Sequence, residues 1–223
     1  MSHIEEVSRR FSLNGLRVVD VGAGTGTYAG QLAAEGAGVI GIEIDPAKVE
    51  QARQTASPEI RFETGRAESL PLPGDCADLV TVLYAWHHIP VAMHSAAADD
   101  IARVLVKGGK LFVAEPKTHG GMTEIILPVD DETTVRNQAE RFLDDIGEGP
   151  VFRLVEKSDY ILTRRYKDYD ALVQAVVYVD PARVALFEQN EDMVRKGFER
   201  LARPDDDGFL IDQPTTLYVF EKL

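Results

Sequence analysis

Short apolar segments alternate with amphipathic segments along the first half of the chain. Apolar runs rich in β-branched residues occupy residues 17–21, 39–42, 60–62, 78–83 and 110–114. They are brief and mostly non-alternating, which is typical of strands buried on both faces of a parallel sheet. Helical periodicity fills residues 27–35, 46–56 and 93–105. The pattern predicts a doubly wound α/β fold with helical crossovers.

Residues typical of helix ends accompany two of these helices. Pro46 suits the first turn of a helix, and Asp45 before it is a suitable N-cap. Gly108 and Gly109 are expected to end the helix that precedes the fifth strand. Both signals agree with helices that connect buried strands.

The second half of the chain is less regular. The pattern predicts a helix over 132–146, an extended stretch over 151–167, helices over 168–178 and 182–202, a turn at 205–208 and a final strand over 215–221. No low-complexity linker and no internal repeat divides the sequence. We therefore expect one domain that spans residues 1–223.

The composition is that of an acidic globular protein. Its 223 residues carry a formal net charge of −13, with 44% hydrophobic and 27% charged residues. A polyanionic partner would meet a repulsive field, so binding of nucleic acid is disfavoured. The basic run at 164–167 is flanked by acidic residues and is best interpreted as a solvated strand edge.

Two features bear on location. No apolar run approaches the roughly 18 residues of a membrane span, and residues 1–6 lack the apolar stretch of a secretory signal. Cys76 is the single cysteine, so no internal disulfide can form and a reducing compartment is favoured. We therefore expect a cytoplasmic protein.

A glycine-rich loop follows the first predicted strand. Gly22, Gly24 and Gly26 occur in the order G-x-G-x-G, and such glycines let the backbone approach a ligand that a Cβ would block. The dinucleotide fingerprint needs a small residue at position 27, where this chain has Thr27. Asp20, two positions before the first glycine, would repel a pyrophosphate but suits an ammonium or sulfonium group.

A second acidic residue ends the second predicted strand. Glu43 is placed to accept hydrogen bonds from both hydroxyls of a ribose. Such charge-assisted bonds contribute about 1.5–3 kcal/mol each. The glycine loop and the two carboxylates together favour a positively charged ligand that contains a ribose.

The motifs as a set resemble the class I methyltransferases, which bind S-adenosylmethionine. Residues 20–26 are similar to their D/E-x-G-x-G-x-G loop. Residues 65–72 (GRAESLPL) resemble the loop beside the adenine, and residues 77–89 (ADLVTVLYAWHHI) resemble the fourth strand, which ends at the reaction centre. Residues 104–111 resemble the run into the fifth strand. Within the class, the chain is most similar to the small-molecule branch that includes ubiquinone- and menaquinone-biosynthesis methyltransferases.

The resemblance implies the fold, the cofactor and the residues that bind it. The implied fold is a Rossmann-like, doubly wound seven-stranded sheet, mostly parallel with an antiparallel last strand. Residues 17–116 would form its cofactor-binding half and residues 117–223 its acceptor-side half. The implied cofactor is S-adenosylmethionine and the implied partner a small-molecule methyl acceptor, while the oligomeric state is open. The residues expected to line the cofactor are Asp20, Gly22, Ala23, Gly24, Glu43, Ile44, Ala67, Glu68 and Leu83.

The chain departs from this branch in two places. Arg66 stands where the branch often has an aspartate that accepts from the adenine amino group, so adenine recognition would rest on the Ala67 backbone and Glu68. Few residues precede the first strand, fewer than the lid helices of the branch. We therefore expect any cover over the acceptor to come from residues beyond 117 or from a partner subunit.

Methyl transfer from a sulfonium needs mainly alignment, and a base only where the acceptor must lose a proton. His87 follows the fourth strand near the expected methyl group and is our candidate base; capping or packing under the loop is the alternative. Tyr84, Trp86 and His88 are expected to line the acceptor pocket, although packing explains the aromatic residues equally well. The histidine spacing matches no ligand motif, so no metal site is expected.

Other functions are less well supported. The fourth strand lacks the N/D-P-P-Y/F signature of enzymes that methylate adenine or glutamine amides, no Pro-Cys nucleophile follows it, and paired acidic metal ligands are missing there. A small-molecule acceptor remains by elimination. A non-catalytic module that binds S-adenosylmethionine, an NAD(P)-dependent oxidoreductase and a protein methyltransferase stay open as alternatives.

Overall fold

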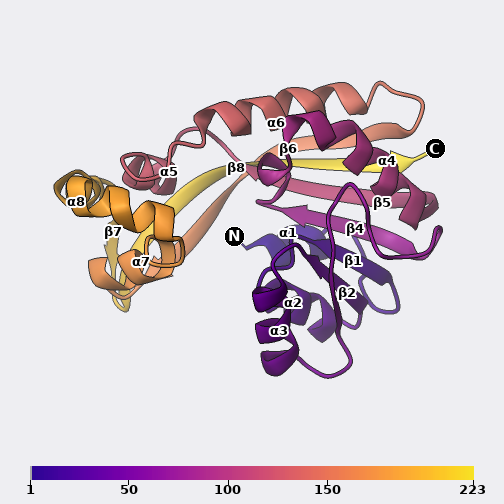
Figure 1. Ribbon diagram of the computed structural model, residues 1–223, viewed down its shortest axis with the longest axis horizontal. Coiled ribbons are helices and arrows are strands. Elements are labelled where there is room, and N and C mark those ends of the chain that lie inside the picture. Colours follow the sequence, from indigo (N-terminus) through magenta and orange to yellow (C-terminus); the bar gives the residue numbers. More distant parts are fainter. Residues whose placement is uncertain (1) are drawn as a thin grey trace. The chain divides into compact units, whose positions relative to one another are not determined.

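The computed structural model describes residues 2–223, which form an eight-stranded mixed sheet with connecting helices (Figure 1). The strand order is β3-β2-β1-β4-β5-β8-β6, and β7 pairs with β8 outside this path. The strands are β1 (Arg17–Val21), β2 (Gly38–Glu43), β3 (Arg61–Thr64), β4 (Ala77–Leu83), β5 (Leu105–Pro116), β6 (Phe152–Tyr166), β7 (Arg203–Asp205) and β8 (Gly208–Lys222). The predicted Rossmann-like fold is confirmed, with one strand more than the seven expected.

The first five strands are parallel. β1 pairs with both β2 and β4, so that Val19 aligns with Ile40 on one side and with Val80 on the other. β3 continues the sheet beyond β2, and β5 continues it beyond β4. Most residues of these strands are buried, which explains why their sequence does not alternate. β7 and β8 pair antiparallel, as expected for the end of the sheet.

The helices between these strands follow the predicted ranges closely. They are α2 (Thr27–Ala34), α3 (Pro46–Thr55) and α4 (His94–Val104), with two short 3₁₀ helices, η1 (Trp86–His88) and η2 (Val91–Met93), before α4. Pro46 occupies the first turn of α3, and the Asp45 carboxylate accepts a 2.8 Å hydrogen bond from the N–H of Ala47. The predicted N-cap is therefore confirmed.

The predicted role of Gly108 and Gly109 is wrong. α4 ends at Val104, and Leu105 already pairs with Ala77 of β4. The pairing then shifts register and resumes at Lys110, so both glycines lie inside β5. Gly108 has a φ of +76°, a conformation that glycine adopts without steric cost. It allows the strand to loop out and does not end a helix.

Besides the short 3₁₀ helices, three elements lie outside the predicted ranges: α1 (His3–Ser8), α5 (Gly121–Ile126) and β7. α1 begins with a capping box, in which the Glu5 carboxylate accepts a 2.7 Å bond from the N–H of Ser2 and the Ser2 hydroxyl accepts from the N–H of Glu5. The S-x-x-E spacing was therefore a usable sequence signal for this helix.

The remaining predicted elements are present. They are α6 (Thr133–Ile146), α7 (Tyr169–Val176) and α8 (Pro181–Leu201), together with β6 over the predicted extended stretch. β8 is much longer than the strand expected at 215–221. No helix within residues 2–223 combines the length and apolar character that crossing a bilayer would require.

The chain forms two compact units. The larger unit contains residues 2–115, 138–158 and 216–223, and the smaller unit contains residues 116–137 and 159–215. The predicted division near residue 116 falls at a unit boundary. However, residues 138–158 and 216–223 belong to the same unit as residues 2–115 and not to the expected acceptor side. One domain over the whole chain stays a prediction.

Each unit has its own apolar core. In the larger unit Ile42, Val80, Leu111 and Phe220 are at most 1% exposed and belong to one cluster. In the smaller unit the buried faces of α5, α7 and α8 pack together, and the place of a Cβ on Gly197 would lie 3.2 Å from the Cα of Ile125. Burial of each large apolar side chain contributes about 1.5–3 kcal/mol, so each core stabilises its unit separately.

Candidate functional site

The strands of the larger unit end at a common edge of the sheet. β1 leads into the glycine loop, Glu43 ends β2, Leu83 ends β4, and Glu115 lies at the end of β5. β1 lies between β2 and β4, so the strand order reverses beside it. Ligands of open α/β sheets bind at the carboxyl ends of the strands at such a point.

The glycine loop lies close to the backbone that follows β4. Gly22 has a φ of +80°, and a Cβ at this position would lie 2.6 Å from the Cβ of Ala85. Gly24 has a φ of +56°, and a Cβ there would have no atom within 4 Å. Gly22 is therefore required for packing, whereas the open space beside Gly24 lets a ligand approach the loop.

Glu43 connects the end of β2 to this loop. Its Oε2 accepts a 2.9 Å hydrogen bond from the N–H of Gly24, and its Oε1 accepts a 3.1 Å bond from the N–H of Asp45. The residue is only 7% exposed. Each carboxylate oxygen can accept a second hydrogen bond, so Glu43 retains capacity for the hydroxyls of a ribose.

Asp20 is a buried carboxylate next to the loop. It is 3% exposed, and its Oδ1 accepts a 2.8 Å bond from the Thr81 hydroxyl. Burial raises the pKa of Asp20 to about 7, and the charge of Glu43 adds to this rise, whereas the bond from Thr81 opposes it. Within residues 2–223 this carboxylate has no ion pair. A cationic ligand group would therefore stabilise its charged form.

Side chains suited to an adenine ring lie beyond β2 and β3. Ile44, next to Glu43, is 55% exposed, and the Ala67 side chain is buried. Arg66 donates a 2.5 Å hydrogen bond to Glu68. Burial raises the pKa of the Glu68 carboxyl, but the pairing with Arg66 outweighs it and lowers the pKa below its ordinary value. Glu68 thus stays ionised and can accept a hydrogen bond from an amino group.

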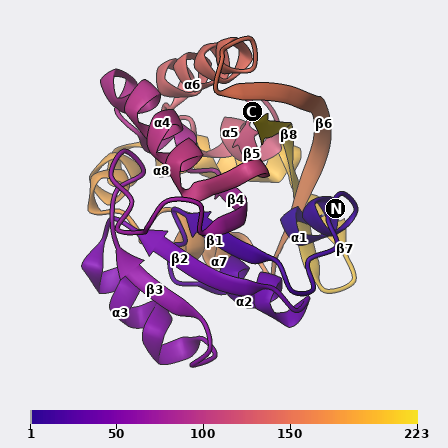
Figure 2. The ribbon, with the colours of Figure 1, turned by 90° about the vertical axis from the view of Figure 1, so that its right-hand side faces the viewer.

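Tyr84 follows β4 in a strained conformation. Its φ is +53°, which is uncommon outside glycine, and its N–H donates a 2.8 Å bond to the carbonyl of Ala114. The His3 ring in α1 meets the Tyr84 ring edge-on, with 4.9 Å between centroids. α1 lies beside α2 (Figure 2). A capped helix before β1 thus places a ring against Tyr84, while the expected source of a cover over the acceptor stays a prediction.

His87 is paired with a carboxylate that sequence reasoning missed. Its Nδ1 lies 2.5 Å from Oε2 of Glu115, whose Oε1 accepts a 2.9 Å bond from the N–H of Trp86. Both His87 and Glu115 are 5% exposed. Glu115 directly follows the apolar run of the fifth strand, so it carried the same signal as Asp20 and Glu43, an acid at the end of a buried strand.

Trp86 and His88 lie in different environments. Trp86 is fully buried, and its ring stacks on that of Phe142, with 5.8 Å between centroids. The burial of Trp86 agrees with the alternative that this residue packs in the core. We therefore no longer count Trp86 among the residues of the acceptor pocket. His88 is exposed, and its ring centroid lies 4.0 Å from that of His87.

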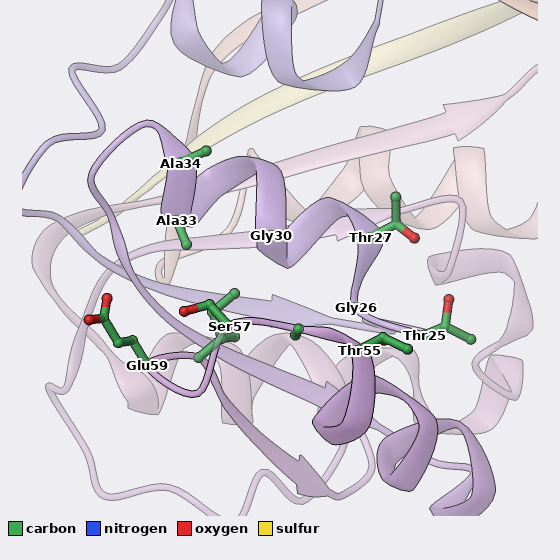
Figure 3. Close-up of a pocket in the computed structure, with 11 residues that line it drawn as sticks. Thr25, Gly26, Thr27, Gly30, Ala33, Ala34, Thr55, Ser57 and Glu59 are labelled. Carbon is green, nitrogen blue, oxygen red and sulfur yellow. The ribbon is translucent and has the colours of Figure 1, made fainter.

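A pocket on the larger unit reaches the end of the glycine loop at Thr25 and Gly26. It has a volume of about 530 Å³ and lies between α2 and the segment after α3 (Figure 3). Its lining consists of Thr25, Gly26, Thr27, Gly30, Ala33, Ala34, Thr55, Ala56, Ser57, Glu59 and Ile60. None of the residues predicted to line the cofactor is among them. The binding of the cofactor at the strand ends therefore stays a prediction that this pocket does not test.

Comparison with known proteins agrees with this geometry. Residues 18–109 match the family described as "Methyltransferase domain". The structure of YcgJ from Bacillus subtilis has the same fold, with a TM-score of 0.63 and 20% identity over 99% of this chain and 98% of that one. The fold is thus that of a Rossmann-like methyltransferase, and residues 18–109 match the methyltransferase domain.

Proteins that are similar to this chain in sequence are also named as methyltransferases. The methyltransferase YcgJ is 35% identical over 103 residues, which are 44% of this chain and 40% of YcgJ. A demethylmenaquinone methyltransferase of Beutenbergia cavernae is 33% identical over 104 residues, 47% of this chain and 42% of that protein. A ubiquinone biosynthesis O-methyltransferase of Xylella fastidiosa is 30% identical over 173 residues, 74% of this chain and 59% of that protein.

The chain spans about half the length of these relatives. Its residues 18–109 match a methyltransferase domain, and the chain is similar to S-adenosylmethionine-dependent methyltransferases of class I, as its motifs indicated.

Proposed function

We propose that the protein transfers a methyl group from S-adenosylmethionine to a small-molecule acceptor. One observation carries the proposal. The Glu43 carboxylate accepts a hydrogen bond from the N–H of Gly24 at the point where the strand order reverses, and the space beside Gly24 is open. A ribose hydroxyl on Glu43 would place the rest of the ligand along the glycine loop. The family match over residues 18–109 supports the same ligand.

The residues at the strand ends fit this cofactor part by part. Glu43 would accept the ribose hydroxyls, and Asp20 would attract the ammonium end of the methionine moiety. Ile44 would cover one face of the adenine, while Glu68 would accept from its amino group. The backbone of Gly22, Ala23 and Gly24 would lie along the part of the ligand between the ribose and the sulfonium. Leu83 would lie near the ribose. Both carboxylates at the loop favour a cation over a pyrophosphate, which argues against a nicotinamide cofactor.

His87 is the group that we propose to handle the acceptor's proton. When bound, S-adenosylmethionine supplies a methyl group that is already activated on a sulfonium. The chain then has to align the acceptor and, where this carries O–H or N–H, to take up one proton. The His87 imidazole, at the end of β4, is the candidate for this proton. Tyr84 and His88 would form part of the acceptor's surroundings.

Two observations support a choice of acceptor class. Two relatives bear names of quinone-biosynthesis enzymes, and the formal net charge of −13 disfavours nucleic acid. We propose a small, hydroxylated organic acceptor. A cytoplasmic location, proposed from the single cysteine, suits such chemistry.

The first test is isothermal titration of the protein with S-adenosylmethionine, S-adenosylhomocysteine, NAD and NADP. We expect micromolar binding of the two adenosyl-sulfur ligands alone. Binding of a nicotinamide cofactor in their place would contradict the assignment of the glycine loop.

The second test separates an enzyme from a binding module. The protein is incubated with methyl-labelled S-adenosylmethionine and a panel of catechols, hydroquinones and amines, and the label is followed by mass spectrometry. Label in one acceptor class supports the proposal. Tight cofactor binding with label in no small molecule, but in an added protein, would establish protein methylation as the activity; label in neither would favour the non-catalytic module.

A further inference from the structure

Thr81 is a polar residue in the interior of an apolar strand. It lies in the run LVTVL of β4, and its side chain is fully buried. A hydroxyl group in such surroundings is costly unless it has a hydrogen-bond partner. Its partner is the carboxyl group of Asp20, whose Oδ1 lies 2.8 Å from the Thr81 hydroxyl oxygen. The one polar side chain of this run is therefore bonded to the acid that precedes the glycine loop.

The register of the sheet explains why Thr81 is this partner. β1 lies between β2 and β4, and Asp20 aligns with Gly41 on one side and with Thr81 on the other. Aligned residues of neighbouring parallel strands lie on the same face of the sheet. Gly41 has no side chain, and a Cβ there would lie 2.6 Å from the ring of Phe62. Because β2 supplies no side-chain donor next to Asp20, the hydroxyl on β4 is the lateral neighbour that can.

The other surroundings of Asp20 disfavour its ionised form. Within residues 2–223 no lysine, arginine or histidine forms an ion pair with it. On the far side of Thr81 the aligned residue is Phe112, which is apolar. Burial raises the pKa of Asp20 to about 7, and the negative charge of Glu43 at the end of β2 adds to this rise, whereas the bond from Thr81 lowers the pKa. Among these neighbours, Thr81 is the group that favours the charged carboxylate.

We infer that Thr81 is a positioning residue of the cofactor site, whose hydroxyl holds the Asp20 carboxylate next to the glycine loop and strengthens its attraction for the cofactor's ammonium group near neutral pH. This inference rests on the proposed function, which places the ammonium group at Asp20. A hydroxyl that donates to a carboxylate stabilises the charged form. A hydroxyl that accepts from a protonated carboxyl stabilises the neutral form. Removal of the hydroxyl therefore has opposite effects in the two cases, which an experiment can distinguish.

The test follows the titration of Asp20 in the protein without added ligand. Aspartate is labelled with ¹³C at its carboxyl carbon, the chemical shifts are recorded as the pH is raised, and Asp20→Asn assigns the signal. Thr81→Val replaces the hydroxyl by a methyl group. In this variant the midpoint of the Asp20 titration should rise by about one pH unit, because a hydrogen bond to the charged form is lost. Thr81→Ser keeps the hydroxyl and should restore a midpoint close to that of wild type.

Thr216→Val is the matched control. Thr216 is a buried threonine of β8, which β5 separates from β4 in the sheet, so the same change there should leave the Asp20 midpoint unchanged. If Thr81→Val fails to fold, Thr81→Cys takes its place; the S–H group is a weak donor, so the midpoint should rise by a smaller amount. An unchanged or lowered midpoint in the folded Thr81 variant, or an equal rise in Thr216→Val, would overturn the inference.

Isothermal titration at pH 7 relates this effect to the cofactor. A midpoint about one pH unit higher lowers the ionised fraction of Asp20 at pH 7 from about one half to about one tenth. Thr81→Val should therefore raise the Kd for S-adenosylmethionine about fivefold, while Thr81→Ser and Thr216→Val should stay within about twofold of wild type.

The two measurements separate this inference from the proposed function. If wild type binds no S-adenosylmethionine, the proposed function fails, and the positioning role in a cofactor site fails with it, whereas the titration still shows whether Thr81 controls the ionisation of Asp20. If Thr81→Val raises the midpoint and yet binds the cofactor as tightly as wild type, the positioning role of Thr81 is overturned while the proposed function stands.

Discussion

The Glu43 carboxylate accepts a 2.9 Å hydrogen bond from the backbone N–H of Gly24, which joins the end of β2 to the glycine loop. The Glu43 side chain therefore has two roles. Glu43 holds the loop next to the open space beside Gly24, and its carboxylate keeps capacity for the hydroxyls of the proposed ribose. Changes at Glu43 should affect cofactor affinity through both roles.

Replacement of Glu43 should weaken the binding of S-adenosylmethionine. We expect Glu43→Ala to raise the Kd at least tenfold, which corresponds to about 1.4 kcal/mol, because charge-assisted bonds to the ribose are lost. Isothermal titration measures this directly. Glu59→Ala serves as the control, since Glu59 lines the pocket beside α2 and should leave the Kd within about twofold. If Glu59→Ala weakens binding and Glu43→Ala does not, the cofactor occupies that pocket.

Replacement of Asp20 should stabilise the protein at alkaline pH. The pKa of about 7 in the folded protein lies above the ordinary value of 3.8, so between these values the folded state holds a proton that the unfolded chain has released. Stability therefore falls as the pH rises from about 4 to 7, by roughly 4 kcal/mol at most. Asn cannot ionise, and its amide oxygen can still accept from Thr81.

Thermal unfolding at pH 5 and pH 8 checks this expectation. The Tm of Asp20→Asn should exceed that of wild type by several degrees at pH 8, and the difference should shrink at pH 5. Equal differences at both pH values would show that Asp20 does not titrate in this range in the folded protein.

The same carboxylate should make cofactor affinity depend on pH. Only ionised Asp20 attracts the ammonium group, so affinity should rise by about 25-fold between pH 5.5 and pH 7.5, following the ionised fraction of a group with a pKa of about 7. Titrations over this range measure it. In Asp20→Asn the affinity should be weak and nearly constant; a pH dependence that persists in this variant would point to another group.

His87→Ala should separate chemistry from cofactor binding. General acid–base catalysis contributes typically about 10²–10⁴-fold, so we expect turnover to fall at least about a hundredfold on the acceptor found by the labelling screen. The Kd for S-adenosylmethionine should change less than threefold, because His87 pairs with Glu115 and not with the glycine loop. Parallel losses of turnover and affinity would indicate a structural role for His87.

Trp86 should act as a core residue. Trp86→Ala should cost about 3–5 kcal/mol in the free energy of unfolding, because a fully buried indole that stacks on Phe142 is removed. Trp86→Phe should cost less than half of this, since Nε1 has no hydrogen-bond partner among residues 2–223. Urea unfolding compares the two variants. Equal costs would imply that the indole N–H is bonded after all.

Elements with a strong local signal could be predicted from the sequence. The buried parallel strands show as short β-branched runs, and the start of α3 shows in the pair Asp45 and Pro46. Asp20 and Glu43 could be predicted as site residues because acids at the ends of buried strands are costly unless they serve a ligand or partner.

Features that depend on tertiary pairing could not be predicted. Glu115 carries the same strand-end signal, yet its partner His87 becomes apparent only when β4 and β5 align. Trp86 follows a strand that ends at the site, and nothing in its neighbours distinguishes a pocket wall from the core. The contact of His3 with Tyr84 likewise requires the fold, because α1 is short and its apolar face is small.

Because of the loop-out within β5, residues can be added to the chain there without a change in the geometry of the site. Pairing with β4 is set once at Leu105 and again from Lys110 to Ala114, and residues 106–109 between them are not bound to that register. Extra residues at Gly108 would enlarge the loop at the far end of the strand, whereas one extra residue after Lys110 would turn Glu115 to the opposite face. The loop at Gly108 is therefore a suitable place for a peptide tag, a spectroscopic probe or a natural insertion.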